Sequence, residues 1–220
     1  MSVVALTVGL SSGACFDEAL ADTQRGTGED ALLTGHEDGI AFMREEEKLA
    51  RDVYLVLFDV WGHATFENIS QSEQRHMDAM LGVIESYGLV DPAEDRAVGS
   101  FENPELQELH DDLVERGSLS LVDALSVGAL IEEVDIIDLE AKLAEAPPGD
   151  VVAVYENLLR GSRNHLRAFV GSLEREGVVY APALLDPVVF TAIVEGEHEP
   201  GSRAGGGDGS QNGDGTGRCS

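Results

Sequence analysis

Apolar and polar positions alternate along this chain with the period of amphipathic helices. Apolar residues recur at intervals of three and four, which is the spacing of one helix face. Four long helices are predicted, at about 37–61, 69–87, 120–144 and 151–177. A shorter helix is predicted at 104–116, with Pro104 at its first position and Gly117 after its end. Gly62 is expected to end the first helix, and Ser70 or Ser72 to lie near the start of the second.

The second of these helices carries polar residues where a core side chain is expected. Its apolar stripe consists of Ile69, Met80, Val83 and Tyr87. Glu73 and His76 fall on the same stripe, and a Glu-x-x-His spacing brings both side chains to one helix face. Burying an ionised carboxylate costs free energy unless it is paired or binds a metal. A single motif of this kind is also typical of a partly exposed Glu beside a hydrogen-bonded core His, so the other helices decide between the two.

The other long helices also carry polar residues on their apolar stripes. Glu47 lies on the stripe of the first helix, whereas its neighbours Glu45 and Glu46 lie off it and are expected to form a solvated face. In the fourth helix, Ser162 and His165 occupy the inward stripe, three residues apart. We infer that polar groups from different helices meet in the interior.

In the third helix the inward acid has two candidates. Glu132 completes the stripe, whereas choosing Glu133 would turn Ser126 and Glu140 inward. Glu132 is therefore the predicted inward carboxylate. Asp135, about one turn further, is expected to hydrogen-bond a ligating imidazole or, alternatively, to face solvent.

The composition limits the classes of function. A chain of 220 residues with 43% hydrophobic residues can bury one sizeable core, so a single domain with tails is expected. The formal charge of -28 argues against nucleic acid and anionic membranes as partners. Acid spread along the whole chain is also what we expect of a halophilic protein, kept soluble in concentrated salt. Arg160, Arg163 and Arg167 are predicted to pair with this surplus acid rather than to bind anions.

Several kinds of site have no counterpart in the sequence. No Ser-His-Asp arrangement and no phosphate-binding Gly loop is present. The two cysteines, Cys15 and Cys219, lie near opposite ends of the chain, which excludes a thiolate zinc site. No role is predicted for the histidines outside the four stripes, which are His36, His63, His110 and His198.

Residues 1–37 and 195–220 are expected to be tails around a domain at 38–194. The apolar run Val3–Leu10, followed by small residues and Cys15, resembles a lipoprotein signal, although Ser12 stands where such signals have Leu. Two alternatives stay open, a cell-surface lipoprotein with a lipid anchor at Cys15 and a cytoplasmic protein with a plain tail. The run is too short to span a membrane. Residues 195–220 are Gly/Asp-rich and predicted to be disordered, and 178–194 to be an irregular segment capping the helices.

The order Glu, Glu-x-x-His, Glu, then His on four successive helices resembles the ligand pattern of the ferritin-like carboxylate-bridged dimetal superfamily. The segment EKLARDVY also resembles the ferritin-type Glu-x-x-Ala-x-x-x-Tyr pattern. More specifically, REEEKLARDVY, LIEEVDIIDLE and LLRGSRNHLRAF together resemble the ferritin-like family known as domain of unknown function 2202. The resemblance implies an all-α fold, a ferritin-like four-helix bundle with a long crossover carrying a short extra helix between helices two and three.

The resemblance also implies a role for each polar residue of the stripes. Glu47 and Glu132 would each be a terminal ligand of one metal ion, His76 and His165 would each bind one ion, and Glu73 would bridge the two.

The chain departs from the pattern at Ser162, where the superfamily has a second bridging Glu. Four carboxylates balance two divalent ions, whereas three leave one positive charge. Either a bridging hydroxide neutralises it or the second ion is weakly bound or absent, so one ion or two is expected. Tyr54, near Glu47, would be either a redox-active or hydrogen-bonding neighbour or a core aromatic with a satisfied hydroxyl.

Two kinds of function are consistent with such a site. The first is an oxidoreductase with iron or manganese, acting on dioxygen, peroxide or ferrous ion, with zinc as an adventitious occupant. The second is a non-catalytic protein, metal-sequestering or partner-binding, whose site has decayed at Ser162. Metal ions are the expected partners and a homodimer is compatible with the pattern, while nothing in it argues for the subunit interface of a storage shell.

Overall fold

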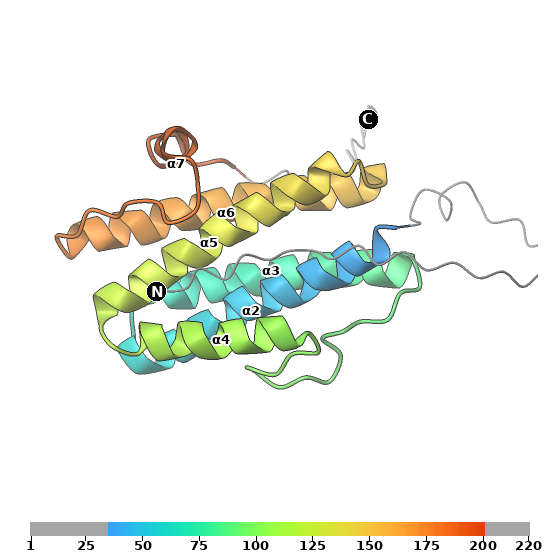
Figure 1. The fold of residues 1–220 in the computed structure, drawn as a ribbon, viewed down its shortest axis with the longest axis horizontal. Helices are drawn as coiled ribbons and strands as arrows, with labels where there is room; N and C mark the ends of the chain where they lie inside the picture. Colours follow the sequence, from blue (N-terminus) through green and yellow to red (C-terminus); the bar gives the residue numbers. More distant parts are fainter. Residues whose placement is uncertain (1–34, 201–220) are drawn as a thin grey trace, which may run out of the picture.

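The computed structural model describes residues 35–200, and within that range it contains six helices and no strand (Figure 1). The four long helices are α2 (Glu37–Trp61), α3 (Ala64–Ser86), α5 (Leu121–Ala144) and α6 (Gly149–Arg175). The two short helices are α4 (Pro104–Gly117) and α7 (Pro187–Val194). The all-helical class is thus confirmed for the described residues. The predictions for the N-terminal segment, acylation at Cys15 included, and for residues 201–220 lie outside them.

The four long helices are arranged as two antiparallel hairpins, α2 with α3 and α5 with α6, lying face to face (Figure 1). Side-chain contacts at the two ends of α3 give the relative direction of the hairpins. Thr65 Oγ1 lies 2.9 Å from Ser172 Oγ at one end, and Tyr87 donates to Asp150 Oδ1 at 2.7 Å at the other. The start of α3 therefore meets the end of α6, so these helices run antiparallel as well.

The turn between α2 and α3 agrees with the sequence at its first residue and departs from it afterwards. Gly62 ends α2 in the left-handed conformation, with φ of 61°, as expected. The next helix begins almost at once, not near Ser70 or Ser72, so that prediction is wrong. His63 caps α3 by accepting a hydrogen bond from the Thr65 N–H at 3.3 Å. Histidine is not among the usual capping residues, which is why the sequence pointed further along.

The crossover from α3 to α5 returns along α2 to the other end of the molecule and carries α4 (Figure 1). A buried ion pair between Lys48 and Asp52 of α2 fixes it there. Lys48 donates to the carbonyl of Ala97 at 2.8 Å, and Asp52 accepts from the Gly99 N–H at 2.9 Å. The crossover thereby covers a face of α2 that would otherwise meet solvent.

The structure overturns the expectation that Glu45 and Glu46 form a solvated face. Glu45 is 3% exposed and Glu46 is 5% exposed. The carboxylate of Glu45 accepts hydrogen bonds from the backbone N–H groups of Glu102 and Asn103, at 2.5 and 2.9 Å, just before α4 begins. A helical period cannot show that a loop from elsewhere in the chain will cover the polar face.

The segment 178–194, expected to be irregular, contains a helix at its end. Asp186 caps α7 by accepting from the Val188 N–H at 2.8 Å, and Pro187 takes the first helical position, where its missing N–H costs nothing. The two prolines of the segment suggested irregular structure. Pro187 instead starts a helix, so this part of the prediction is wrong.

Glu133, rejected as an inward residue, is also fully buried, on a face of α5 next to that of Glu132. It accepts four hydrogen bonds, from the hydroxyl of Tyr180 and from the N–H groups of Ala183, Leu184 and Leu185. One carboxylate therefore attaches the segment before α7 to the long helices.

An aromatic cluster forms the core between the hairpins at the end where α3 begins. The ring of Tyr54 lies 5.1 Å from that of Phe169 and 6.2 Å from that of Phe66, centroid to centroid. Gly128 gives Phe169 its space, because a Cβ at this position would lie 2.3 Å from the ring. The result is a closely packed aromatic layer, which contacts Glu132 through the hydroxyl of Tyr54.

Candidate metal centre

The carboxylate of Glu73, on α3, lies between two imidazoles from different helices. Its Oε2 is 2.7 Å from Nδ1 of His76, one turn along the same helix. Its Oε1 is 2.6 Å from Nδ1 of His165, on α6. Both imidazoles thus present the same ring nitrogen to one carboxylate, which is the arrangement expected of a bridging group.

Glu47 and Glu132 complete the cluster on either side. Glu47 Oε2, from α2, is 3.1 Å from Nδ1 of His76, and Glu132 Oε2, from α5, is 3.5 Å from Nδ1 of His165. Two groups of three result, each with its donor atoms within 4.8 Å of one another, and they share Glu73. The structure therefore brings together all five residues singled out from the sequence, and we call them the carboxylate–histidine cluster.

The cluster is closed to solvent on its acidic side. Glu47, Glu73 and Glu132 are 0% exposed, whereas His76 is 6% and His165 is 8% exposed. Only the imidazoles retain any contact with water, on the side of α3 and α6. Three carboxylates with almost no solvation require compensating positive charge, because an isolated buried carboxylate is very costly.

The pKa values show how the metal-free protein meets that requirement. Burial would lower the pKa of His165, but the charges of Glu73 and Glu132 outweigh burial and raise it to about 10. The pKa of His76 is likewise raised, against burial, by Glu73 and Glu47. Burial raises the pKa of Glu47 to about 7, and the neighbouring charge of His76 acts in the opposite direction. Protonated imidazoles therefore supply the positive charge in the absence of a cation.

Several buried atoms of the cluster make no contact with the geometry of a hydrogen bond among the described residues. They are Oε1 of Glu47 and, despite their short ion-pair distances, both oxygens of Glu73, Oε2 of Glu132 and Nδ1 of His165. Buried polar atoms are almost always satisfied in native proteins, so such a group of unsatisfied atoms needs an explanation. Convergent, unsatisfied oxygen and nitrogen donors are what a metal ion requires.

Tyr54 hydrogen-bonds to the cluster, although not to the residue nearest in sequence. Its hydroxyl donates to Glu132 Oε1 at 2.5 Å, from α2 to α5. Burial first, and then the charge of Glu132, raises the pKa of this phenol well above its ordinary value. The hydroxyl therefore stays protonated and holds one oxygen of Glu132, leaving Oε2 directed to His165.

Asp135 does not hydrogen-bond an imidazole in this structure, so that expectation is corrected, and neither does it face solvent. The residue is 1% exposed, and its Oδ2 accepts a hydrogen bond from Ser162 Oγ at 2.8 Å. Ser162 is buried at the inward position expected of it, three residues before His165, and the partners of its hydroxyl are Asp135 and the carbonyl of Leu158, not a residue of the cluster. A short polar side chain on α6 and a buried carboxyl group on α5 are thus paired.

Glu46 is a second buried acid beside the cluster, and the sequence reasoning missed it. Burial first, and then the charges of Asp135 and Asp138, raise its pKa well above the ordinary value. Its Oε2 has no hydrogen-bond partner within residues 35–200. The only signal in the sequence is the run of three acids at 45–47, which is indistinguishable from a solvated surface without knowledge of how α5 packs against α2.

Gly161 shapes the space around the imidazoles. A Cβ at this position would lie 2.4 Å from Cε1 and 2.5 Å from Nε2 of His76, far inside ordinary contact distance. The backbone of α6 therefore packs directly on the edge of that ring. Any side chain at residue 161 would displace the imidazole from its place against the two carboxylates.

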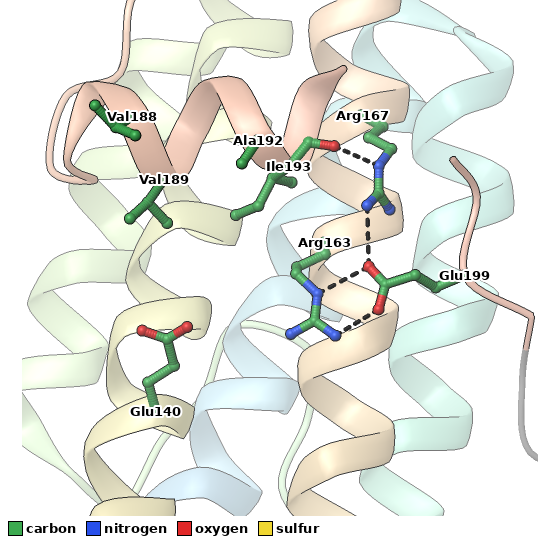
Figure 2. Close-up of a pocket in the computed structure, with 8 residues that line it drawn as sticks. All are labelled: Glu140, Arg163, Arg167, Val188, Val189, Ala192, Ile193 and Glu199. Carbon is green, nitrogen blue, oxygen red and sulfur yellow. Dashed lines mark hydrogen bonds and ion pairs between the residues drawn. The ribbon is translucent and has the colours of Figure 1, made fainter. Parts of the chain in front are cut away.

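Two arginines of α6, Arg163 and Arg167, point toward Glu199 beside α7 (Figure 2), whereas Arg160 donates to Asn157 Oδ1. Glu199 Oε1 accepts hydrogen bonds from Arg163 Nε at 2.8 Å and from Arg167 Nη2 at 2.9 Å. Together with α7 they border a surface cavity of about 370 Å³. Ion pairing within the chain, which was expected for these residues, thus occupies both guanidinium groups.

The fold and the site define a class, an all-helical protein whose four long helices converge on a buried cluster of three carboxylates and two imidazoles. The chain belongs to the family described as "Uncharacterized protein domain (DUF2202)", whose sequence model matches residues 36–197. The more specific of the two sequence resemblances is thereby confirmed.

Two comparisons with individual proteins agree with the family. The curated "Uncharacterized protein MJ0754" of Methanocaldococcus jannaschii is 47% identical over 164 residues, which cover 74% of this chain and 89% of that protein. The crystal structure of hypothetical protein MJ0754 from Methanococcus jannaschii DSM 2661 is similar with a TM-score of 0.72 and 43% identity, covering 83% of this chain and all of that one. The relatives add no activity to what the site itself implies.

Within residues 35–200, no helix combines the length and the apolar character needed to cross a membrane.

Proposed function

We propose that this protein is a ferritin-like four-helix bundle that binds one or two iron or manganese ions and uses them in oxidoreductase chemistry on dioxygen, peroxide or ferrous ion. The observation that supports the proposal most is the place of Glu73, whose two oxygens lie 2.7 and 2.6 Å from imidazoles of two different helices. A carboxylate shared in this way divides the donors into two groups of three. Glu47 and His76 would hold one ion, and Glu132 and His165 the other.

The chemistry of the donors indicates which metals fit. Carboxylate oxygens with imidazole nitrogens and no thiolate suit iron and manganese, and zinc would be an adventitious occupant after purification. A bound iron or manganese ion would supply the redox chemistry that amino-acid side chains lack. The chain itself excludes water with its apolar core, and Tyr54 fixes the orientation of Glu132 through the 2.5 Å hydrogen bond.

The protonation of the imidazoles gives the proposal a signature that needs no catalytic assay. Ligating imidazoles must be neutral, yet the pKa of His165 is about 10 and that of His76 is raised in the metal-free protein. At pH 7 both rings carry a proton that a cation would displace. Titration with Mn²⁺ should therefore release protons, which can be counted by repeating the calorimetry in buffers of different ionisation enthalpy.

The central experiment uses protein purified without a metal-affinity tag. Anaerobic titration with Fe²⁺ gives the stoichiometry, and addition of dioxygen or peroxide then tests turnover. Glu73→Gln should lose binding because it removes the shared donor, and Glu85→Gln, an exposed position of the same helix, should behave as the parent protein. Failure of the parent protein to bind Fe²⁺ or Mn²⁺ would overturn the proposal.

A protein that sequesters metal is the second candidate, favoured by the complete burial of the three carboxylates. It predicts stoichiometric binding of Fe²⁺ with no consumption of dioxygen and no decay of peroxide. Turnover of either oxidant beyond one equivalent per bound ion would exclude it.

A further inference from the structure

Asp135 is a buried acid of α5 outside the carboxylate–histidine cluster, and unlike Glu133 it has an oxygen without a hydrogen-bond partner. Its Oδ2 accepts a hydrogen bond from Ser162 at 2.8 Å, and its Oδ1 has no partner among the described residues. At 1% exposure, water does not compensate this oxygen either. An unsatisfied carboxylate oxygen in a dry interior calls for a cation or a donor.

The charge of the cluster calls for an additional negative group. Two divalent cations bring four positive charges, and Glu47, Glu73 and Glu132 bring three negative ones once both imidazoles are neutral. One positive charge remains in a site that excludes water, and uncompensated buried charge is strongly destabilising. A fourth carboxylate would make the site neutral.

The position of Asp135 allows it to provide that charge. Its hydrogen-bond partner, Ser162, stands on the inward stripe of α6, one turn before His165. A glutamate at residue 162 would extend toward the space that the Asp135 carboxyl group borders, because that group lies at hydrogen-bond distance from the Ser162 side chain. After burial, the charges of Glu47, Glu132 and Glu73 are what raises the pKa of Asp135, so it lies within electrostatic reach of all three.

We propose that Asp135 is the fourth carboxylate ligand of the two-cation site, donating Oδ1 from α5, and that Ser162 positions it by holding Oδ2. This inference rests on the proposed function. Asp135 lies outside the two groups of three donors, so binding through Oδ1 would require its side chain to rotate while the bond to Ser162 is kept. The chain thus replaces a long acidic side chain of one helix with a short acid of another and a serine.

The test compares metal stoichiometry and affinity among matched variants. Asp135→Asn keeps the shape of the side chain and removes its charge. It should bind one Mn²⁺ per chain with parental affinity, while the second binds about tenfold to a hundredfold more weakly or not at all. Ser162→Ala keeps the charge and loses the positioning bond, so the second ion should weaken only a few-fold. Glu140→Gln, an exposed position of the same helix, is the control and should bind as the parent protein.

The double variant Asp135→Asn/Ser162→Glu gives the most direct test of the charge argument. It returns a carboxylate to the site from α6, so it should recover the second ion if charge on this side of the cluster is what matters. The thermal stability of the metal-free Asp135→Asn protein should be unchanged or higher, because one of several mutually repelling buried acids is gone. A merely structural Asp135 would instead give a less stable protein.

The outcomes separate the two proposals. If the parent protein and Asp135→Asn both bind two ions with the same affinity, the role of Asp135 is overturned and the proposed function remains intact. Parental protein binding no ion would overturn both. Recovery of the second ion by the double variant would support Asp135 as a ligand, and failure of a folded double variant to recover it would count against it.

Discussion

Replacing Gly161 with Ala should disrupt the carboxylate–histidine cluster, although residue 161 makes no polar contact with it. The new Cβ would lie 2.4 Å from Cε1 of His76, whereas ordinary contact begins near 3.4 Å, so the ring must move by about 1 Å. It has no room to do so as a rigid unit, because Glu47 and Glu73 lie 3.1 and 2.7 Å from its Nδ1. The imidazole must therefore rotate out of the cluster.

Two opposing effects determine the change in stability. Alanine favours the helix over glycine by about 1 kcal/mol. Overpacking of a well-packed interior costs about 1 to 3 kcal/mol. We expect Gly161→Ala to lower the free energy of unfolding by up to about 2 kcal/mol, and loss of one imidazole donor to weaken the ion bound through His76 at least tenfold, about 1.4 kcal/mol.

Gly171 gives a matched control on the same helix. A Cβ there would meet no atom within 4 Å, so Gly171→Ala should raise stability by about 1 kcal/mol and leave metal binding unchanged. Urea denaturation of the metal-free proteins measures stability, and calorimetric titration with Mn²⁺ measures affinity. If Gly161→Ala proved as stable as Gly171→Ala and bound both ions with parental affinity, the close packing of α6 on His76 would be refuted.

Three further predictions concern other parts of the molecule. Glu133→Ala leaves the N–H groups of Ala183, Leu184 and Leu185 without their acceptor, and because only Leu185 of these is buried it should cost about 1 to 3 kcal/mol, measured by urea denaturation; a loss below about 0.5 kcal/mol would contradict the role given to this carboxylate. Hydrogen bonds from Arg163 and Arg167 lower the pKa of Glu199 to about 2, below its ordinary 4.5. The contribution of Glu199 to the free energy of unfolding is therefore fully present above pH 4.5 and is lost as the pH falls toward 2. An NMR titration of its carboxyl carbon will show or refute the lowered pKa. The melting temperature should rise steeply with molar KCl because the net charge is -28, and a flat dependence would remove the halophilic interpretation.

The helical periodicity was sufficient to predict the long helices and the inward side chains of the cluster. A period of 3.6 residues identifies the buried face of a helix. That face is an apolar stripe interrupted by one or two polar residues in each long helix, which are Glu47, Glu73, His76, Glu132 and His165. Their convergence at one level of the molecule follows from the packing of the four helices. Their roles as ligands stay predictions.

The sequence could not show where a further layer would cover a polar face. Glu45 lies off the stripe of α2 and is buried by the crossover, whereas Glu46 faces Asp135 and Asp138 of α5. Glu133 lies beside the stripe of α5 and is buried by the segment before α7. In each case the neighbouring residues are fifty or more positions away, so no local pattern contains the information. The orientation of Asp135 was unpredictable for a related reason, since its partner is a short side chain on another helix.

The two triads of the carboxylate–histidine cluster draw their residues from different parts of the chain. Glu47, Glu73 and His76 all belong to the first hairpin, whereas Glu132 and His165 belong to the second. A nascent polypeptide that has left the ribosome only as far as the end of α3 already contains one complete triad of donors, before the rest of the protein is synthesised. Under the proposed function, the donors of one ion are therefore all synthesised before those of the other are complete.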